Sequence, residues 1–160
     1  MATDNKIKTA VPQAGHGPFT GPDDKATVKI SRQEVLRKYT LATENVLLFR
    51  AENGAEIAGT YAMTKSGSNT GTYKIMSTLT ADPAGTGNDA KDITAATNVS
   101  DTAYALTTPA VINTTTYTSK AGNTLPLNQI EKGRYVWLVA TAGTSKVVDV
   151  FINWFDSVIL

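Results

Sequence analysis

The chain contains no cysteine, and its 160 residues include one histidine, His16. Without cysteine there is no disulfide framework, no thiolate nucleophile and no cysteine ligand for zinc. His16 stands between two glycines and has no second histidine with which to share a metal ion. The side chains that most often act as a base or nucleophile near neutral pH are therefore nearly absent. We expect neither an enzyme nor a bound metal or other cofactor.

Charge is also scarce. Charged residues make up 18% of the chain, against about 25% in an average protein. The formal net charge of +1 gives no overall attraction to nucleic acid or to an anionic membrane. No stretch reaches the roughly 18 consecutive apolar residues of a membrane span, and the N-terminus is too polar for a secretory signal peptide. We therefore expect partners that are proteins, with no nucleic acid and no membrane among them.

Two local patterns have a possible ligand and a simpler explanation. Gly85-Thr-Gly-Asn-Asp89 resembles half of a calcium-binding glycine-rich repeat, with Asp82 and Asp92 nearby, but such repeats bind calcium when stacked and the chain has one copy. A surface turn is the better interpretation. A basic cluster beside Tyr39 could contact single-stranded nucleic acid, but acidic residues interrupt it, and a solvated face explains it more simply; its members are Lys25, Lys29, Arg32, Arg37 and Lys38.

Residues 1–25 are predicted to form an extended arm. Prolines alternate with glycines between residues 12 and 22, and this pattern excludes a helix or the interior of a sheet. Val11 and Phe19 are isolated apolar residues in this segment, and together with His16 they are candidate contact residues. We favour an arm that docks, on its own domain or on a neighbouring subunit, over a frayed terminus.

Residues 26–160 are predicted to form one β domain. Short segments rich in β-branched and aromatic residues recur between turn residues. The expected fold is all-β, an antiparallel β-sandwich or small barrel, possibly jelly-roll-like, with at most one short helix. That helix would follow the capping-box pattern Ser31-Arg-Gln-Glu34. The alternative is a strand that begins at Ala26 and continues through Leu41.

The sequence predicts two hairpins. In the first, Val46–Arg50 and Ala55–Tyr61 flank Asn53-Gly54, the strongest short hairpin signal. The second joins 134–141 to 146–155 through Gly143.

The second hairpin is the most apolar part of the chain. We expect it to lie centrally in a sheet, since an uncovered apolar strand invites aggregation, and to present part of its aromatic face at a subunit contact. Trp137 and Trp154 would then lie on facing strands, and the apolar C-terminus would pack against the sheet or a neighbour. The candidate interface residues here are Trp137, Trp154, Phe155 and Leu160.

The Gly/Pro-rich arm at residues 11–22, the Thr- and Ala-rich β body and the apolar ending at Leu160 together resemble, in overall style, small virion proteins of tailed bacteriophages, above all head decoration or cement proteins. The resemblance implies a symmetric homo-oligomer, a trimer first of all, made in the host cytoplasm. It would bind the major capsid protein on the capsid surface and stabilise the lattice. Two alternatives stay open: a tail-tube or fibre-associated subunit, and a carbohydrate- or ligand-binding β module that stacks exposed aromatic rings on its ligand.

Overall fold

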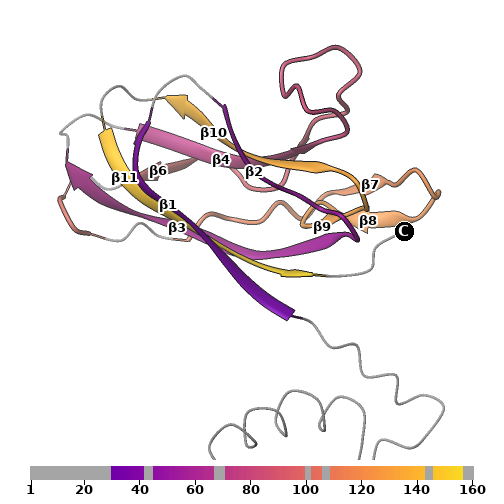
Figure 1. Ribbon diagram of the computed structural model, residues 1–160, viewed down its shortest axis with the longest axis horizontal. Coiled ribbons are helices and arrows are strands. Elements are labelled where there is room, and N and C mark those ends of the chain that lie inside the picture. Colours follow the sequence, from indigo (N-terminus) through magenta and orange to yellow (C-terminus); the bar gives the residue numbers. More distant parts are fainter. Residues whose placement is uncertain are drawn as a thin grey trace, which may run out of the picture. The chain divides into compact units, whose positions relative to one another are not determined.

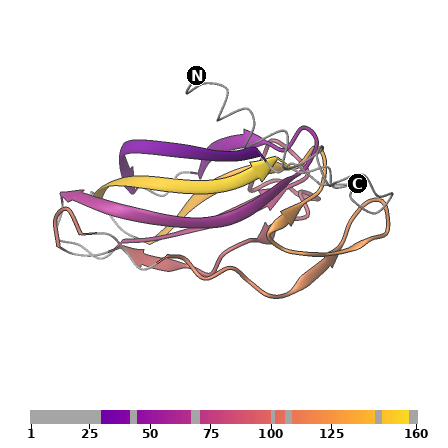
Figure 2. The same cartoon turned by 90° about the horizontal axis from the view of Figure 1, so that it is seen from below.

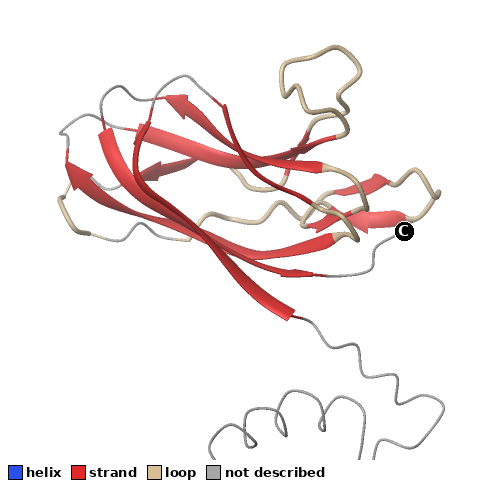
Figure 3. Ribbon diagram, in the orientation of Figure 1, coloured by secondary structure: helices blue, strands red, loops and turns tan. Residues whose placement is uncertain are grey.

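A computed structural model describes residues 30–41, 45–66, 71–99, 102–105, 109–142 and 146–156, with the side chains at 30, 31, 33–38, 141 and 142 excepted. The chain divides into two units, Met1–Ile30 and Ser31–Leu160, and apart from Ile30 itself every described residue belongs to the second. The predicted arm lies outside the described residues, and so does Leu160. All regular secondary structure in the described part is β, without a helix (Figure 3).

The described residues form eleven strands: β1 (Ile30–Leu41), β2 (Asn45–Arg50), β3 (Ala55–Ser66), β4 (Gly71–Thr78), β5 (Lys91–Asp92), β6 (Thr97–Val99), β7 (Thr116–Thr118), β8 (Thr124–Pro126), β9 (Gln129–Ile130), β10 (Tyr135–Ala142) and β11 (Lys146–Asp156).

Most of these strands belong to two sheets that form the two layers of a sandwich (Figures 1 and 2). Sheet A has the order β1-β11-β3-β9. Sheet B has the order β2-β10-β4-β5, and β6 also pairs with β4. Strands β7 and β8 form a separate two-stranded sheet. The registers between β10 and β4 and between β11 and β3 are antiparallel. The all-β sandwich predicted from the sequence is therefore confirmed.

Alternation along the long strands produces the core, because successive side chains point to opposite faces of a sheet. Every second residue of β11 and β10 faces the other layer, and the side chains that meet there are fully buried: Val148, Val150 and Ile152 from sheet A, and Tyr73, Ile75, Val136 and Leu138 from sheet B. The core thus lies between the sheets and draws on both of them.

One side of the sandwich is closed by the chain between β4 and β7. Ile93 donates its backbone N–H to Ile75 of β4, and Ala110 donates to Thr60 of β3. A bridge between Thr94 and Ile112 joins these two segments. The two sheets are therefore connected through hydrogen bonds along this side. On the opposite side, β1 and β2 end their sheets, and each has one strand partner among the described residues.

Neither predicted hairpin forms. Strands β2 and β3 flank the Asn53-Gly54 turn but belong to different sheets. The connection between them is held by the start of β10: Ala51 donates its N–H to Arg134, and Gly133 donates to Ala51. Gly54 has a φ of 110°, which an L side chain rarely adopts. The turn therefore takes the chain across to the other sheet.

The prediction of the closing hairpin is also wrong, because β10 is in sheet B and β11 is in sheet A. Each is nevertheless central in its own sheet, β10 between β2 and β4, and β11 between β1 and β3. The expected central position therefore holds without the expected pairing. The short helix after Ser31 is also absent, since β1 runs through Leu41, as the strand alternative predicted. Hydrogen bonds to β11 satisfy backbone groups of β1 that a helix would satisfy within the segment.

Candidate functional site

A buried arginine with several hydrogen bonds lies where β10 begins. The side chain of Arg134 is 0% exposed. Its Nη1 lies 3.0 Å from Asp89 Oδ2 and 3.0 Å from Glu131 Oε1, and its Nε donates to Ser77 Oγ at 3.1 Å. Its Nη2 donates to the backbone carbonyl of Asp89. The guanidinium therefore ties together the end of β4, the loop before β5 and the turn before β10.

Tyr117 connects the β7–β8 hairpin to the same cluster. Its ring lies 5.4 Å from the guanidinium carbon of Arg134. Its hydroxyl donates to the carbonyl of Gln129 at 2.9 Å and accepts from the N–H of Glu131 at 3.1 Å. Burial raises the pKa of Tyr117 above its ordinary value of 10. The hydroxyl thus stays protonated and able to donate at neutral pH.

The contacts of this cluster join separate segments of the chain and stabilise the fold. Arg134 and Glu131 are both buried, and their charged atoms are occupied by one another and by neighbouring polar groups. A general acid or base must reach its substrate within hydrogen-bond distance, and these atoms are enclosed by the fold. Among the described residues, no group of three or more potential metal-binding side chains comes together.

The loop from Leu79 to Ala90 follows β4 (Figure 1). The side-chain oxygens of Asp82 and Asn88 accept hydrogen bonds from backbone N–H groups of the same loop. Asp82 Oδ1 accepts from the N–H of Ala84 at 3.0 Å. Asn88 Oδ1 accepts from the N–H of Ala90 at 3.2 Å, and Asn88 Nδ2 donates to the carbonyl of Pro83. The bonds accepted by Asp82 and Asn88 are typical of Asx turns, which agrees with the interpretation of this segment as a surface turn.

Asp89 makes the cluster sensitive to pH. Burial acts to raise the pKa of Asp89, but hydrogen bonds from Lys91 and Arg134 outweigh it, and the pKa is lowered from 3.8. A carboxylate whose pKa is lower in the folded state stabilises the fold above its unfolded pKa, and this contribution is lost as the pH falls through the folded value. We therefore expect the free energy of unfolding to decline on acidification below about pH 4.

Asp89→Asn should reduce stability at pH 7 and make this acid decline shallower, as urea unfolding between pH 7 and pH 3 would measure. Asp82→Asn is the matched control, because Asp82 lies in the same loop and its carboxylate accepts from a backbone N–H. Equal acid sensitivity of the two variants would contradict the assignment to Asp89.

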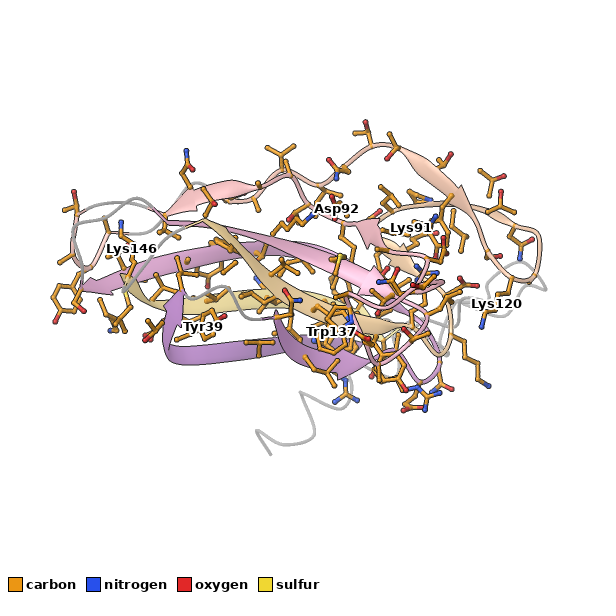
Figure 4. All side chains as sticks on the ribbon, turned by 90° about the horizontal axis from the view of Figure 1, so that it is seen from above. Tyr39, Lys91, Asp92, Lys120, Trp137 and Lys146 are labelled. Atoms are coloured by element: carbon orange, nitrogen blue, oxygen red, sulfur yellow. The ribbon has the colours of Figure 1, made fainter. Side chains whose placement is uncertain are left out.

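The aromatic candidates of the closing strands lie in different environments. Trp154 is 7% exposed, and its ring stacks on Phe49 of the other sheet, with centroids 4.0 Å apart and an interplanar angle of 9°. Trp137, labelled in Figure 4, is 6% exposed and donates from Nε1 to Thr78 Oγ1 at 2.8 Å. Phe155 is half-buried and faces Glu56 across the β11–β3 pair. Both tryptophans are thus enclosed within one chain, and Phe155 keeps some exposed surface.

The sequence did not predict that two aromatic rings stack on the outer face of sheet A. Tyr61 and Phe151 face one another across β3 and β11, with ring centroids 4.8 Å apart and an interplanar angle of 11°. Both are half-buried. Next to them, Lys65 Nζ lies 3.4 Å from Asp149 Oδ2 and 5.2 Å from the ring centroid of the exposed Tyr104. The available signal was the position of Tyr61 on β3, where the residues on either side of it, Thr60 and Ala62, face the core.

The position of β2 at the end of sheet B, with no strand beside its outer edge among the described residues, was also missed. Leu47 lies on β2 and is 46% exposed, one of three large exposed hydrophobic residues in the described part, with Tyr104 and Val111. The run Asn-Val-Leu-Leu-Phe-Arg of β2 is nearly continuously apolar, and such a run suggests a buried central strand. A strand's position within its sheet depends on which distant segments pair with it, and this information is absent from the local pattern.

The described residues contain no helix long and apolar enough to cross a membrane. No protein-family model matches the chain, and no curated protein matches it. Among solved structures, a chain of the cyanophage Pam1 capsid asymmetric unit is similar over 79% of this chain and 82% of that chain, at 13% sequence identity and a TM-score of 0.31. A likeness at this level carries no argument about function.

Proposed function

We propose that this protein is a structural component of a virus particle that binds a capsid lattice as a symmetric homo-oligomer and stabilises it, in a decoration or cement role on the capsid surface. The observation that carries the proposal is an apolar strand edge at β2 that has no partner among the described residues, with Leu47 exposed at its centre. Unpaired strand edges are templates for pairing with another chain. A protein whose task is assembly has a use for such an edge.

The distribution of charge supports the same function. Several charged groups are directed at one another: Arg134 at Asp89 and Glu131, and Lys74 at Asp92, with Nζ 2.7 Å from Oδ1. This arrangement stabilises the sandwich and leaves these charges neutralised, so they offer little attraction to a nucleic acid. We propose that the protein has no enzymatic activity.

The arrangement of the aromatic rings is less favourable to the carbohydrate-binding alternative. A sugar stacks on the open face of a ring, but Tyr61 and Phe151 stack on each other, so each ring covers one face of its neighbour. Strand-edge pairing does not need an open ring face. A tail-tube or fibre-associated subunit would use the same surfaces, and its position in the particle separates it from a decoration protein.

The proposal is tested by co-sedimentation of the purified protein with expanded capsids of the virus that encodes it. We expect the full chain to bind, to raise the temperature at which the capsids rupture, and to run as a symmetric oligomer, a trimer first of all, in size exclusion with light scattering. Absence of binding would refute the decoration role. A monomer that binds glycans and no capsid would support the ligand-binding module.

Deleting residues 1–25 should weaken capsid binding or oligomer formation while the β-type circular dichroism spectrum is retained. The reason is the pattern of isolated apolar Val11 and Phe19 among prolines and glycines, which is typical of an extended docking segment. A matched variant, Val11→Ser with Phe19→Ser, separates the loss of these contacts from the loss of chain length. Unchanged binding by the truncated protein would refute the docking arm.

A further inference from the structure

Strand β2 is the end strand of sheet B. Among the described residues it pairs with β10 along one edge, and its other edge has no strand beside it. Natural proteins usually protect such an edge with proline, lysine or an inward-pointing charge. The sequence of β2 has no proline and no lysine, and its single charge is Arg50 at the end. Two features do protect the edge of β2 against pairing: the strand is short, and its pairing with β10 has one irregularity.

That irregularity determines which side chains of β2 lie on the outer face of sheet B. The register with β10 shifts by one residue, so that Val136 faces Phe49 but Trp137 faces Leu47. The extra residue, Leu48, changes the alternation. As a result, the three exposed residues of the strand are Asn45, Leu47 and Arg50. They form an outer row that is polar at both ends and apolar in the middle.

This row is complementary to itself when it is reversed. If two copies of β2 run antiparallel with Leu47 opposite Leu47, the bulge in each strand places Asn45 opposite Arg50 of the other copy. An amide oxygen then meets a guanidinium that can donate to it, and leucine meets leucine. No two like charges face each other in this register, and like charges directly opposite would destabilise the pair.

From this self-complementarity we infer that β2 is a site of contact with a second copy of this chain, through antiparallel β2–β2 pairing centred on Leu47. The pairing extends sheet B across a two-fold axis and hydrogen-bonds the unpaired backbone groups of both edges. In the single chain the guanidinium carbon of Arg50 lies 5.4 Å from the ring centroid of Tyr135 on β10, and its Nη1 lies 3.5 Å from Glu52 Oε1. The side chain is 49% exposed and therefore accessible to Asn45 of a second copy.

The contact is small. Stable complexes bury about 1,200–2,000 Å², more than a six-residue strand provides, so the pair forms best where copies are concentrated, as on a lattice. A contact across a two-fold axis joins two copies and leaves no equivalent surface for a third. In a trimeric protein it would therefore join neighbouring trimers. The inference supplies a self-contact for the proposed function, but it does not depend on capsid binding.

The absence of native cysteine allows a direct test. In Leu47→Cys the two thiols face each other across the two-fold axis, and mild oxidation of the full-length protein should give a disulfide-linked dimer. Val111→Cys is the matched control, because Val111 is apolar, is 68% exposed and lies in the segment that closes the other side of the sandwich. We expect cross-linking of Leu47→Cys to be at least about tenfold faster, since pairing raises the effective concentration of the thiols.

A second experiment tests the register. Asn45→Cys and Arg50→Cys proteins, mixed in equal amounts, should give the mixed disulfide in preference to either self-disulfide. Leu47→Lys should abolish the cross-links in both backgrounds, because it places two like charges opposite each other. Equal cross-linking rates for Leu47→Cys and Val111→Cys would overturn the contact, and a statistical mixture of disulfides would overturn the register. Both experiments use the isolated protein, so their failure would leave the capsid-binding proposal standing.

Discussion

Replacing Arg134 with alanine is expected to lower the free energy of unfolding by about 3–5 kcal/mol, because removal of one partner leaves an uncompensated charge in the interior. Glu131 is buried, and its Oε1 would lose the guanidinium that lies 3.0 Å away. Ser77 Oγ and the carbonyl of Asp89 would lose their donors in the same step. The loss therefore affects three chain segments at once.

Urea unfolding followed by tryptophan fluorescence measures this loss, and Arg32→Ala is its matched control. Arg32 makes the same kinds of contact as Arg134: its Nε lies 2.6 Å from Asp156 Oδ2, and its guanidinium carbon lies 5.6 Å from the ring centroid of Trp154. Its side chain is 52% exposed, however, and exposed ion pairs contribute about 0–1 kcal/mol. Similar losses in the two variants would show that burial does not set the strength of the Arg134 cluster.

The sequence predicted the strands better than it predicted their partners. The alternation within Thr72–Leu79 predicts β4, and the apolar runs at 134–141 and 146–155 predict β10 and β11 almost to the residue. Strand formation depends on local periodicity, which a sequence displays directly. Sheet membership depends on hydrogen bonds between distant segments, such as the bond from Gly133 to Ala51. A turn signal such as Asn53-Gly54 reports a change of direction without specifying which sheet the next strand joins.

The buried charge cluster was not predictable for a related reason. Arg134 stands at the start of an apolar strand, where a sequence-based interpretation places a solvated charge. Its burial requires Asp89, 45 residues away, and Ser77, 57 residues away. A weak signal existed in the spacing of Glu131 and Arg134, two opposite charges three residues apart around a glycine just before a strand. Arginine and glutamate are almost never fully buried unless they are paired.

The edge position of β2 illustrates the limits of apolar content as a guide to burial. A central position was predicted for the apolar closing strands, and it holds for β10 and β11. It does not hold for β2, which has apolar residues at four of its six positions and yet ends its sheet. Val46, Leu48 and Phe49 pack against the core from this edge, and Leu47 is left outside. The same sequence therefore contributes to the core and leaves one large apolar side chain exposed.

Replacing Trp154 with alanine is expected to cost about 3–5 kcal/mol, the usual range for loss of a large aromatic ring from a core. The indole fills the space between the sheets and stacks on Phe49, so its removal leaves a cavity at the contact of the two layers. Because the ring is buried within one chain, the fall in melting temperature should be the same at low and high protein concentration. Phe155→Ala, at the adjacent half-buried position, should cost less. A loss that appears at low concentration alone would instead assign Trp154 to a subunit contact.

A comparison of the two tryptophans separates packing from hydrogen bonding. Phenylalanine at either position removes a similar volume. At position 137 it also removes the bond from Nε1 to Thr78 Oγ1, worth about 1 kcal/mol. The Nε1 of Trp154 is buried and has no hydrogen-bond partner in the described part of the chain, and an unsatisfied buried donor carries a desolvation penalty. Trp154→Phe relieves that penalty, so we expect it to destabilise the protein less than Trp137→Phe. The reverse order in urea unfolding would mean that the Trp154 indole finds an acceptor in the folded protein.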